Sequence, residues 1–217
     1  MIIKTFQGGF DKNLSYLIWC GSTRIAGIVD ASVELTEIIE CVEMNNLKLE
    51  KVFITHTHFD HINYLEDIKY QFPQIQVCGF NNSEEALGEN YRKLNHHEII
   101  PLGSEMFTAL HTPGHYPDSM CFWNKKGNCV FTGDTMFVGR TGRTIGAKSN
   151  ISHLYTSIYN ELLKLPPKTI IYSGHHYGYK ASITLKENIS SSSFFQCASQ
   201  DEFIAVMEQY EKNRRIS

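Results

Sequence analysis

Short apolar runs, separated by glycine, asparagine and charged residues, recur along the whole chain and are typical of β-strands. In the first half these runs predict strands over residues 2–6, 14–19, 25–29, 51–55, 75–78 and 99–102. In the second half they predict strands over residues 106–110, 120–123, 129–132 and 169–172. Two strand-rich halves predict two sheets in an αβ/βα sandwich, with the functional site at one edge.

Apolar residues at helical spacing lie between these strands and after them. They predict helices over residues 35–42, 62–72, 151–165 and 203–210. Ser32 is the predicted N-cap of the first helix, and Pro73 ends the second. The segment from Ser199 to Glu202 matches a capping box and predicts the start of the last helix.

The composition is that of an ordinary globular protein. The chain has 217 residues, of which 42% are hydrophobic and 20% are charged, and its formal net charge is −3. No apolar run approaches the roughly 18 residues of a membrane span. The chain has no excess of basic residues, so binding to nucleic acid is not predicted. We expect a single domain over residues 1–217, with a short helical C-terminal extension from about residue 182.

The cysteines and the first residues bear on the cellular compartment. The six cysteines include no Cys-x-x-Cys pair, and the first ten residues lack the pattern of a signal peptide. We therefore expect reduced cysteines in the core and a protein that is located in the cytoplasm.

A dense group of metal-ligand residues follows the predicted strand over residues 51–55. His56, His58, Asp60 and His61 form a His-x-His-x-Asp-His pattern. Side chains two residues apart point to the same face of a strand, so His56 and His58 can meet at one point. Imidazole and carboxylate groups suit zinc, iron or manganese. Four such residues in so short a segment favour two adjacent ions over a single tetrahedral site.

Three further candidate ligands follow other predicted strands. His115 comes after a Pro-Gly turn, Asp134 comes directly after the strand over residues 129–132, and His175 comes after the strand over residues 169–172. A carboxylate at the position of Asp134 is a natural bridge between two ions.

The order of these motifs resembles the metallo-β-lactamase fold superfamily over nearly the whole chain. His-x-His-x-Asp-His, Thr-Pro-Gly-His, Thr-Gly-Asp and Ser-Gly-His all occur, in that order. The resemblance implies an α/β fold, namely the four-layer αβ/βα sandwich of two mixed sheets flanked by helices. It also implies the metal ligands: His56, His58 and His115 for one ion, Asp60, His61 and His175 for the other, and Asp134 for both. Asp30 matches a position where the family often has an aspartate near the site.

Within the superfamily, the chain is most similar to glyoxalase II, which is hydroxyacylglutathione hydrolase, and to the persulfide dioxygenases. Residues 131–143 resemble the glyoxalase II segment after the bridging aspartate, which implies that Arg143 contacts glutathione. Residues 175–177 resemble the family's Gly-His-x-Tyr, which implies the same role for Tyr177. An arginine offers a fork of donors to a carboxylate, and a tyrosine offers a hydroxyl on a rigid ring.

The other branches differ from the chain at single positions. Persulfide dioxygenases hold one iron on the equivalents of His56, His115 and Asp134. They usually have aspartates where this chain has Ile145 and His176, and these differences favour the hydrolase. True β-lactamases of this fold commonly have cysteine at the position of the bridging aspartate.

The resemblance implies a metal-dependent hydrolase of the glyoxalase II type, which hydrolyses a thioester such as an S-2-hydroxyacylglutathione. Asp60 and Asp134 would hold a metal-bound hydroxide that attacks the carbonyl carbon. The expected cofactors are two divalent metal ions, with zinc first and iron or manganese as alternatives. The expected partner is a small glutathione-linked molecule, with no nucleic acid and no membrane, and the oligomeric state stays open.

Three alternative functions remain. One is a mononuclear iron persulfide dioxygenase that acts on glutathione persulfide. The second is another hydrolase of the same fold, such as a lactonase or a phosphodiesterase. The third is a binding module that keeps the metal for stability alone.

Overall fold

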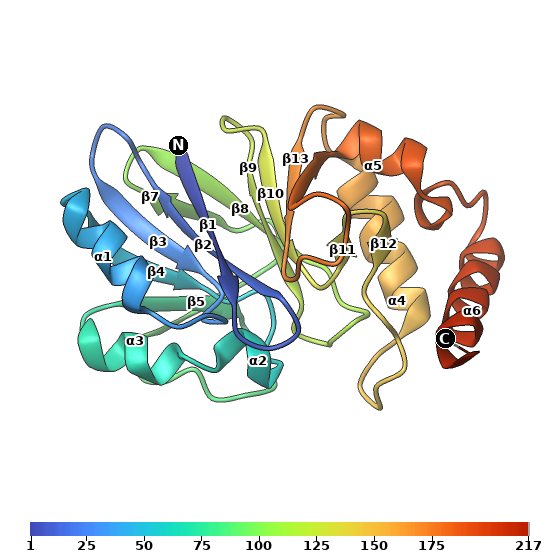
Figure 1. Cartoon of the computed structure of the whole chain (residues 1–217), viewed down its shortest axis with the longest axis horizontal. Helices are drawn as coiled ribbons and strands as arrows, with labels where there is room; N and C mark the ends of the chain where they lie inside the picture. Colours follow the sequence, from blue (N-terminus) through green and yellow to red (C-terminus); the bar gives the residue numbers. More distant parts are fainter. Residues whose placement is uncertain (217) are drawn as a thin grey trace.

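Two six-stranded sheets pack face to face in the computed structural model, which describes residues 1–216 and their side chains up to residue 214. The first sheet has the order β1-β2-β3-β4-β5-β6 and mixes antiparallel with parallel pairs (Figure 1). Its strands are β1 (Ile2–Gly8), β2 (Asn13–Trp19), β3 (Ile25–Val29), β4 (Lys48–Phe53), β5 (Gln76–Phe80) and β6 (Tyr91–Leu94). No helix among the described residues is long and apolar enough to cross a membrane.

The second sheet has the order β14-β13-β10-β9-β8-β7 and is also mixed, with β10 and β13 parallel. Its strands are β7 (Ile99–Leu102), β8 (Glu105–His111), β9 (Met120–Asn124), β10 (Cys129–Gly133), β13 (Ile170–Ser173) and β14 (Ser182–Thr184). A small antiparallel ribbon of β11 (Met136–Phe137) and β12 (Arg140–Thr141) follows β10.

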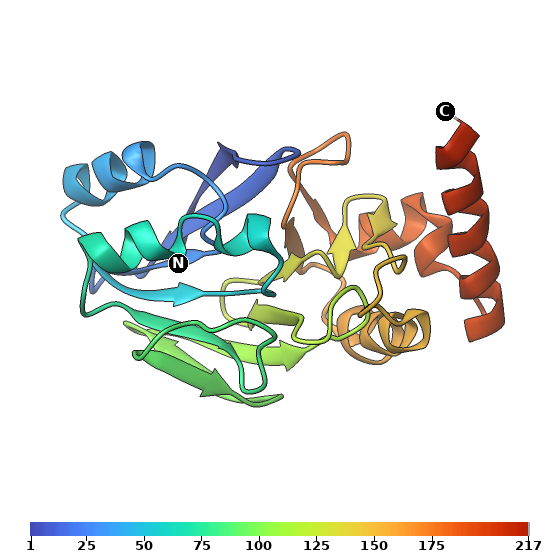
Figure 2. The same cartoon turned by 90° about the horizontal axis from the view of Figure 1, so that it is seen from below.

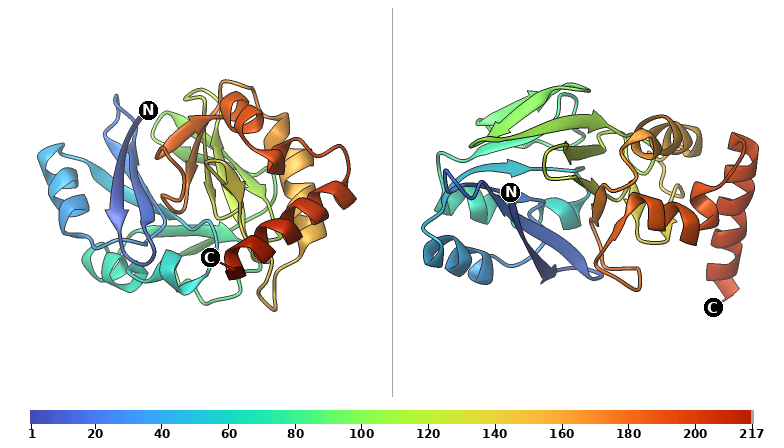
Figure 3. Two further views of the ribbon diagram at one scale, coloured as in Figure 1. Left: turned by 45° about the vertical axis from the view of Figure 1, so that its right-hand side comes forward. Right: turned by 90° about the horizontal axis from the view of Figure 1, so that it is seen from above.

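Helices cover the outer face of each sheet. The helices on the first sheet are α1 (Thr36–Met44), α2 (Phe59–Ile62) and α3 (Leu65–Gln71). The helices on the second are α4 (Ile151–Thr156), α5 (Leu185–Ser191) and α6 (Gln200–Ile216). α4 continues as a π-helical turn (Ser157–Glu161) and a 3₁₀ turn (Leu162–Lys164), and another 3₁₀ turn (Ser193–Phe195) follows α5. Figure 2 shows α6 at the opposite end of the molecule from α1, and Figure 3 shows it lying across α4.

The core has three parts, which correspond to the three spaces between four layers. Aromatic residues fill the space between the sheets, where Tyr16, Phe53, Phe107, Phe122 and Phe131 are almost fully buried. The other two parts lie between each sheet and its helices. Every residue of β2 is buried because both faces of its sheet are covered. The predicted four-layer αβ/βα arrangement of two mixed sheets is confirmed.

The structure corrects two predicted helices. The first helix begins at Thr36, and Ser32 is not its N-cap because its backbone N–H donates to Ser15 Oγ in the buried connection from β3. The predicted helix over residues 62–72 is split into α2 and α3. Its backbone breaks there because Tyr64 N donates to Ala31 O while Ala31 N donates to His61 O.

Several short elements were not predicted. These are β6, the ribbon of β11 and β12, and β14. Residues 182–184, where a helical extension was expected to begin, form β14 and pair with β13 before α5 starts. A capping box at Thr184 and Glu187 starts α5. At the start of α6 Ser199 Oγ accepts from Glu202 N, as expected for its N-cap.

Candidate metal centre

The seven predicted ligands gather at one edge of the sandwich, where strands from both sheets end. The segment from residue 56 to residue 61 follows β4 of the first sheet, and the other three ligands follow β8, β10 and β13 of the second. Since parallel strands present their carboxyl ends at the same edge, residues distant in sequence meet there. We call this set the central cluster; its members are His56, His58, Asp60, His61, His115, Asp134 and His175.

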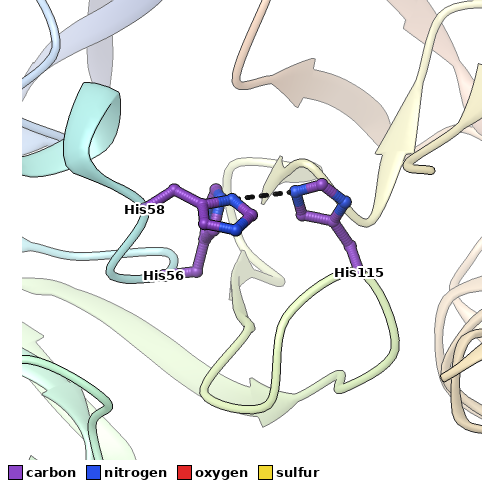
Figure 4. Close-up of side chains that lie close together, drawn as sticks. All are labelled: His56, His58 and His115. Atoms are coloured by element: carbon purple, nitrogen blue, oxygen red, sulfur yellow. Dashed lines mark hydrogen bonds between the residues drawn. The ribbon is translucent and has the colours of Figure 1, made fainter. Parts of the chain in front are cut away.

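Three imidazoles form the first group in the central cluster. His58 Nδ1 lies 3.0 Å from His56 Nε2 and 3.1 Å from His115 Nε2. Figure 4 shows the three rings converging, two from the segment after β4 and one from the loop after β8. This is the grouping that the sequence predicted for one ion.

The second group contains one carboxylate and two imidazoles. His61 Nε2 lies 3.3 Å from His175 Nε2, and Asp60 Oδ2 lies 3.6 Å and 3.4 Å from these two nitrogens. Asn13, which the sequence analysis missed, donates from Nδ2 to Asp60 Oδ2 at 3.0 Å and orients that carboxylate. This is the grouping that was predicted for the other ion.

Asp134 lies between the two groups. Its Oδ2 is 3.5 Å from His115 Nε2 and 3.4 Å from His175 Nε2, and its Oδ1 is 3.4 Å from His61 Nε2. Oδ1 is buried and has no hydrogen-bond partner among the described residues. A buried carboxylate oxygen without a partner costs free energy, so its position fits a cation that both groups share.

Hydrogen bonds outside the cluster fix the orientation of four of its histidines. In each of them Nδ1 faces an oxygen and Nε2 faces the other ligands. The pairs are His56 with Thr55 Oγ1 (3.2 Å), His61 with Asp30 Oδ2 (2.8 Å), His115 with Arg143 O (2.8 Å) and His175 with Asp11 O (3.0 Å). When Nδ1 carries the proton, the lone pair of Nε2 is directed into the cluster, as a metal ligand requires.

Asp30 connects the ends of β3 and β4 to this arrangement. Its carboxylate accepts from Thr55 N and Thr55 Oγ1, both at 2.7 Å, and from His61 Nδ1 at 2.8 Å. The residue is buried and has a φ of 57°, in the left-handed region that aspartate and asparagine tolerate. Asp30 therefore holds a ligand-bearing loop and one imidazole at the same time.

Close packing leaves no room for side chains at one position of the Ser-Gly-His motif. A Cβ atom on Gly174 would lie 2.5 Å from Asp134 Oδ1 and 2.6 Å from His61 Cε1.

Asp118 supports the loop that contains His56 and His58. It accepts from Thr57 N at 3.2 Å and from Thr57 Oγ1 at 2.5 Å. Asp118 was missed, although it stands only three residues after His115.

The local electrostatics suit a cation. Burial lowers the pKa of His56, and it lowers the pKa of His58 to about 4, so both rings are neutral at pH 7. Burial opposes ionisation of Asp134, yet the charges of His61 and His175 hold the pKa of its carboxyl well below the usual value. Against the effect of burial, Asp134 and Asp60 raise the pKa of His175 to about 9. A divalent metal binds ionised carboxylates and neutral imidazoles, so binding would displace the protons of His61 and His175, whose positive charges stand in for the ion.

The two predicted substrate contacts lie beside the central cluster and line one cavity of about 370 Å³. Arg143 forms a two-bond ion pair with Glu211 of α6, and Tyr177 Oη donates to Asp11 Oδ2 at 2.6 Å. Arg140 also lines this cavity, and its guanidinium lies 3.9 Å from the centre of the Tyr177 ring. We call this the basic cavity.

A second cavity, of about 540 Å³, opens on the Asp60 side of the cluster. Glu34 and Glu37 line it, and the described residues around it include no lysine or arginine. The two sides of the metal centre therefore differ in charge, and an anionic ligand is favoured on the side of Arg140 and Arg143.

A second set of similar residue types lies away from this edge. His96 Nε2 is 3.6 Å from Glu161 Oε1, and His97 Nε2 is 3.4 Å from Glu161 Oε2. The two imidazole rings are exposed and stacked. His111 N donates to His96 Nδ1 at 3.0 Å. We call these three residues, His96, His97 and Glu161, the peripheral cluster.

The four-layer sandwich and the central cluster together define a protein of the metallo-β-lactamase fold with a metal centre at the edge of its sheets. The sequence profile of the metallo-beta-lactamase superfamily matches residues 8–175, and the chain belongs to this superfamily.

Individual relatives cover the chain to different extents. The probable hydroxyacylglutathione hydrolase glo2 of Schizosaccharomyces pombe is 34% identical over 175 residues, which are 78% of this chain and 66% of that protein. The chain thus spans slightly less than two thirds of this relative's length. The probable polyketide biosynthesis zinc-dependent hydrolase PksB of Bacillus subtilis is 28% identical, over 93% of this chain and 89% of that protein. The crystal structure of ETHE1 from Myxococcus xanthus superposes with a TM-score of 0.86 and 32% identity, over 96% of this chain and 90% of that one.

Proposed function

We propose that the chain is a dinuclear metallo-hydrolase that cleaves thioesters of a small anionic thiol, of the S-2-hydroxyacylglutathione kind. The observation that carries this proposal is the pair of interlocking ligand groups with Asp134 between them. A single-ion site would need only one of these groups. The similarity to hydroxyacylglutathione hydrolases supports the substrate class.

The chain's own residues supply binding and orientation in this reaction. The central cluster would hold two divalent ions, with zinc as the proposed metal, in keeping with the zinc-dependent relative PksB. Such a pair lowers the pKa of a water molecule and polarises a carbonyl group. Asp60 and Asp134, which are ionised at neutral pH, would accept hydrogen bonds from that water and orient it. A thiolate is a weakly basic leaving group, so the reaction needs no separate general acid.

The charge of the cavities supports an anionic substrate. The basic cavity touches His115 and Asp134, and it contains three arginines together with two tyrosines. The cavity on the Asp60 side is acidic and would repel a carboxylate. We therefore place the glutathione portion near Arg140, Arg143 and Tyr177, with its thioester toward the central cluster.

One observation favours a second candidate, the iron persulfide dioxygenase. ETHE1 from Myxococcus xanthus matches this chain over nearly its whole length, whereas the match to the probable hydroxyacylglutathione hydrolase glo2 covers 66% of that protein. His56, His115 and Asp134 are close enough to contribute to a single iron site. The second group, Asp60, His61 and His175, would then have no role in catalysis.

The test is the hydrolysis of S-lactoylglutathione by protein purified without chelator, with metal content measured on the same sample. We expect turnover that EDTA abolishes and zinc restores, with two ions per chain. A sample that contains metal, hydrolyses no thioester and consumes oxygen with glutathione persulfide would establish the dioxygenase instead. Lactones and phosphodiesters, tested beside the thioester, address the other hydrolases of this fold.

The cytoplasm stays the proposed compartment. All six cysteines are buried and none is in a disulfide, as expected in a reducing environment.

A further inference from the structure

Both residues that the sequence predicted as glutathione contacts already have carboxylate partners within the chain. Arg143 donates from Nε to Glu211 Oε1 at 2.8 Å and from Nη2 to Glu211 Oε2 at 2.7 Å. This is a two-bond, charge-assisted pair, and the Glu211 side chain is only 14% exposed. A substrate carboxylate that took the place of Glu211 would have to break both of these charge-assisted bonds, which is costly.

Arg140 is placed differently in the same cavity. No ion pair joins it to a carboxylate of the described residues, and its Nε is buried without a hydrogen-bond partner. Its guanidinium lies over the Tyr177 ring and donates to Tyr210 Oη of α6. The aromatic rings hold the guanidinium in place, and within the described part of the chain no acid pairs with its charge.

Arg143 has a second contact, which leads to the metal centre. Its backbone carbonyl accepts from His115 Nδ1 at 2.8 Å, and this bond turns Nε2 of that histidine into the central cluster. The ion pair with Glu211 therefore ties α6 to the segment that orients a predicted metal ligand.

We propose that Arg140 receives the carboxylate of the substrate and that Arg143, held by Glu211, is a positioning residue for His115. The proposal rests on the proposed function insofar as the substrate is an anionic thiol derivative. Helix α6 would then take part in substrate selection. Its Tyr210 accepts from Arg140, and its Glu211 pairs with Arg143, so that Arg143 does not bind the substrate.

The kinetic test compares two thioesters with the same acyl group on the metal-loaded enzyme. S-lactoylglutathione is anionic, and S-lactoyl-N-acetylcysteamine is neutral. We expect Arg140→Met to raise KM for the anionic substrate about tenfold or more, as the loss of a charge-assisted hydrogen bond predicts. The value of kcat and the KM of the neutral substrate should change less than about twofold. Arg140→Lys, which keeps the charge, should recover part of the affinity.

The positioning role predicts a different pattern for the other two residues. Arg143→Met and, more weakly, Glu211→Gln should lower kcat for both substrates by the same factor. Glu208→Gln is the matched control, since it makes the same charge change on the exposed side of α6. If Glu211→Gln lowers KM for the anionic substrate alone while Arg140→Met changes nothing, Arg143 is the receptor and the proposal is wrong.

A binding measurement separates this proposal from the proposed function. Calorimetry with S-methylglutathione, a thioether that cannot be hydrolysed, needs no turnover. Binding that Arg140→Met weakens about tenfold, in a protein that hydrolyses neither thioester, would support the receptor and remove the hydrolase. Equal binding by the wild type and Arg140→Met, or no binding by the wild type, would overturn the receptor whatever the activity.

Discussion

The central and peripheral clusters contain the same kinds of residues, yet they differ in the exposure of their side chains and in the partners of their ring nitrogens. The central cluster is largely buried, whereas His96 and His97 are exposed. In the central cluster, four histidines direct Nδ1 to an oxygen acceptor. In the peripheral cluster, His96 Nδ1 accepts from a backbone N–H, so its neutral ring carries the proton on Nε2, which faces Glu161.

We infer from this difference that donor atoms in proximity are not sufficient for a metal site. A ring nitrogen that carries a proton has no lone pair to give to a metal, and in His96 this nitrogen is the one that faces Glu161. In the central cluster the outer hydrogen bonds free the inward nitrogens, and the second carboxylate supplies the charge that an ion needs. The proton positions of the imidazoles therefore separate a binding site from a hydrogen-bonded surface group.

The largest effect should follow a change at the residue that both central groups share. Asp134→Ala removes the carboxylate between them, so we expect bound metal to fall below two ions per chain. Thioester hydrolysis should fall by about a thousandfold or more, since an activated water is lost. Elemental analysis and initial rates on one preparation measure both. Full metal content and activity in a folded Asp134→Ala protein would contradict the assignment of this site.

A smaller effect should follow the loss of one outer hydrogen bond. Asp30→Asn keeps the left-handed backbone conformation, but an amide has one accepting oxygen in place of two. It therefore loses either the bond from Thr55 N or the bonds from His61 Nδ1 and Thr55 Oγ1. We expect zinc affinity and kcat/KM to fall about 10–100-fold. Competition with a chromogenic chelator measures the affinity, and thermal unfolding of the zinc-loaded form shows whether the fold is kept. An unchanged zinc affinity would mean that the hydrogen bond at His61 Nδ1 has little effect on metal binding.

The peripheral cluster should tolerate the loss of its imidazoles. The double substitution His96→Gln and His97→Gln should leave metal content unchanged and activity within about twofold of the wild type. Exposed substitutions of this kind change the free energy of unfolding by about 0.5 kcal/mol or less. If the double variant loses one ion per chain, the peripheral cluster is a metal site and the distinction fails.

The smallest effect concerns the titration of single rings, observed by NMR on the zinc-loaded protein. Burial, followed by the charge of His97, lowers the pKa of His96 below its usual value, whereas ligated rings of the central cluster should not titrate near neutral pH. A lowered folded pKa means that His96 favours the folded state above its unfolded pKa, and that this contribution is lost as pH falls through the folded pKa. The contribution is small because the side chain is 39% exposed. A titration midpoint for His96 above the usual value would contradict the expected lowering of its pKa.

The sequence predicted the strands best where an apolar run is enclosed by turn residues, as in β3 and β7. It failed where long-range hydrogen bonds override local preference. Ser32 has the residue type of an N-cap, but Ser15, seventeen residues away, binds its backbone. β14 is only three residues long and depends on its pairing with β13, so its own side chains carry little signal.

The site follows the same rule. All seven residues of the central cluster were named from motifs, because metal ligands must have particular side chains at particular spacings. Their partners were mostly not found, since Asn13, Asp11 and Glu211 meet the site only through the fold. Arg143 was identified as a contact for the substrate, while its pairing with a residue 68 positions later could not be read from the chain.

The predicted ligands belong to both halves of the sandwich, four after β4 and three after strands of the second sheet. Bound ions would thus add a cross-link between two layers that are otherwise joined by apolar packing and by hydrogen bonds such as that from Tyr16 Oη to Ser173 O. In hydrogen exchange we expect the amides of β4 and β13 to open together in the metal-loaded protein, as one cooperative unit. After chelation they should open separately, so that metal supply would set the lifetime of the chain against proteases as well as its activity.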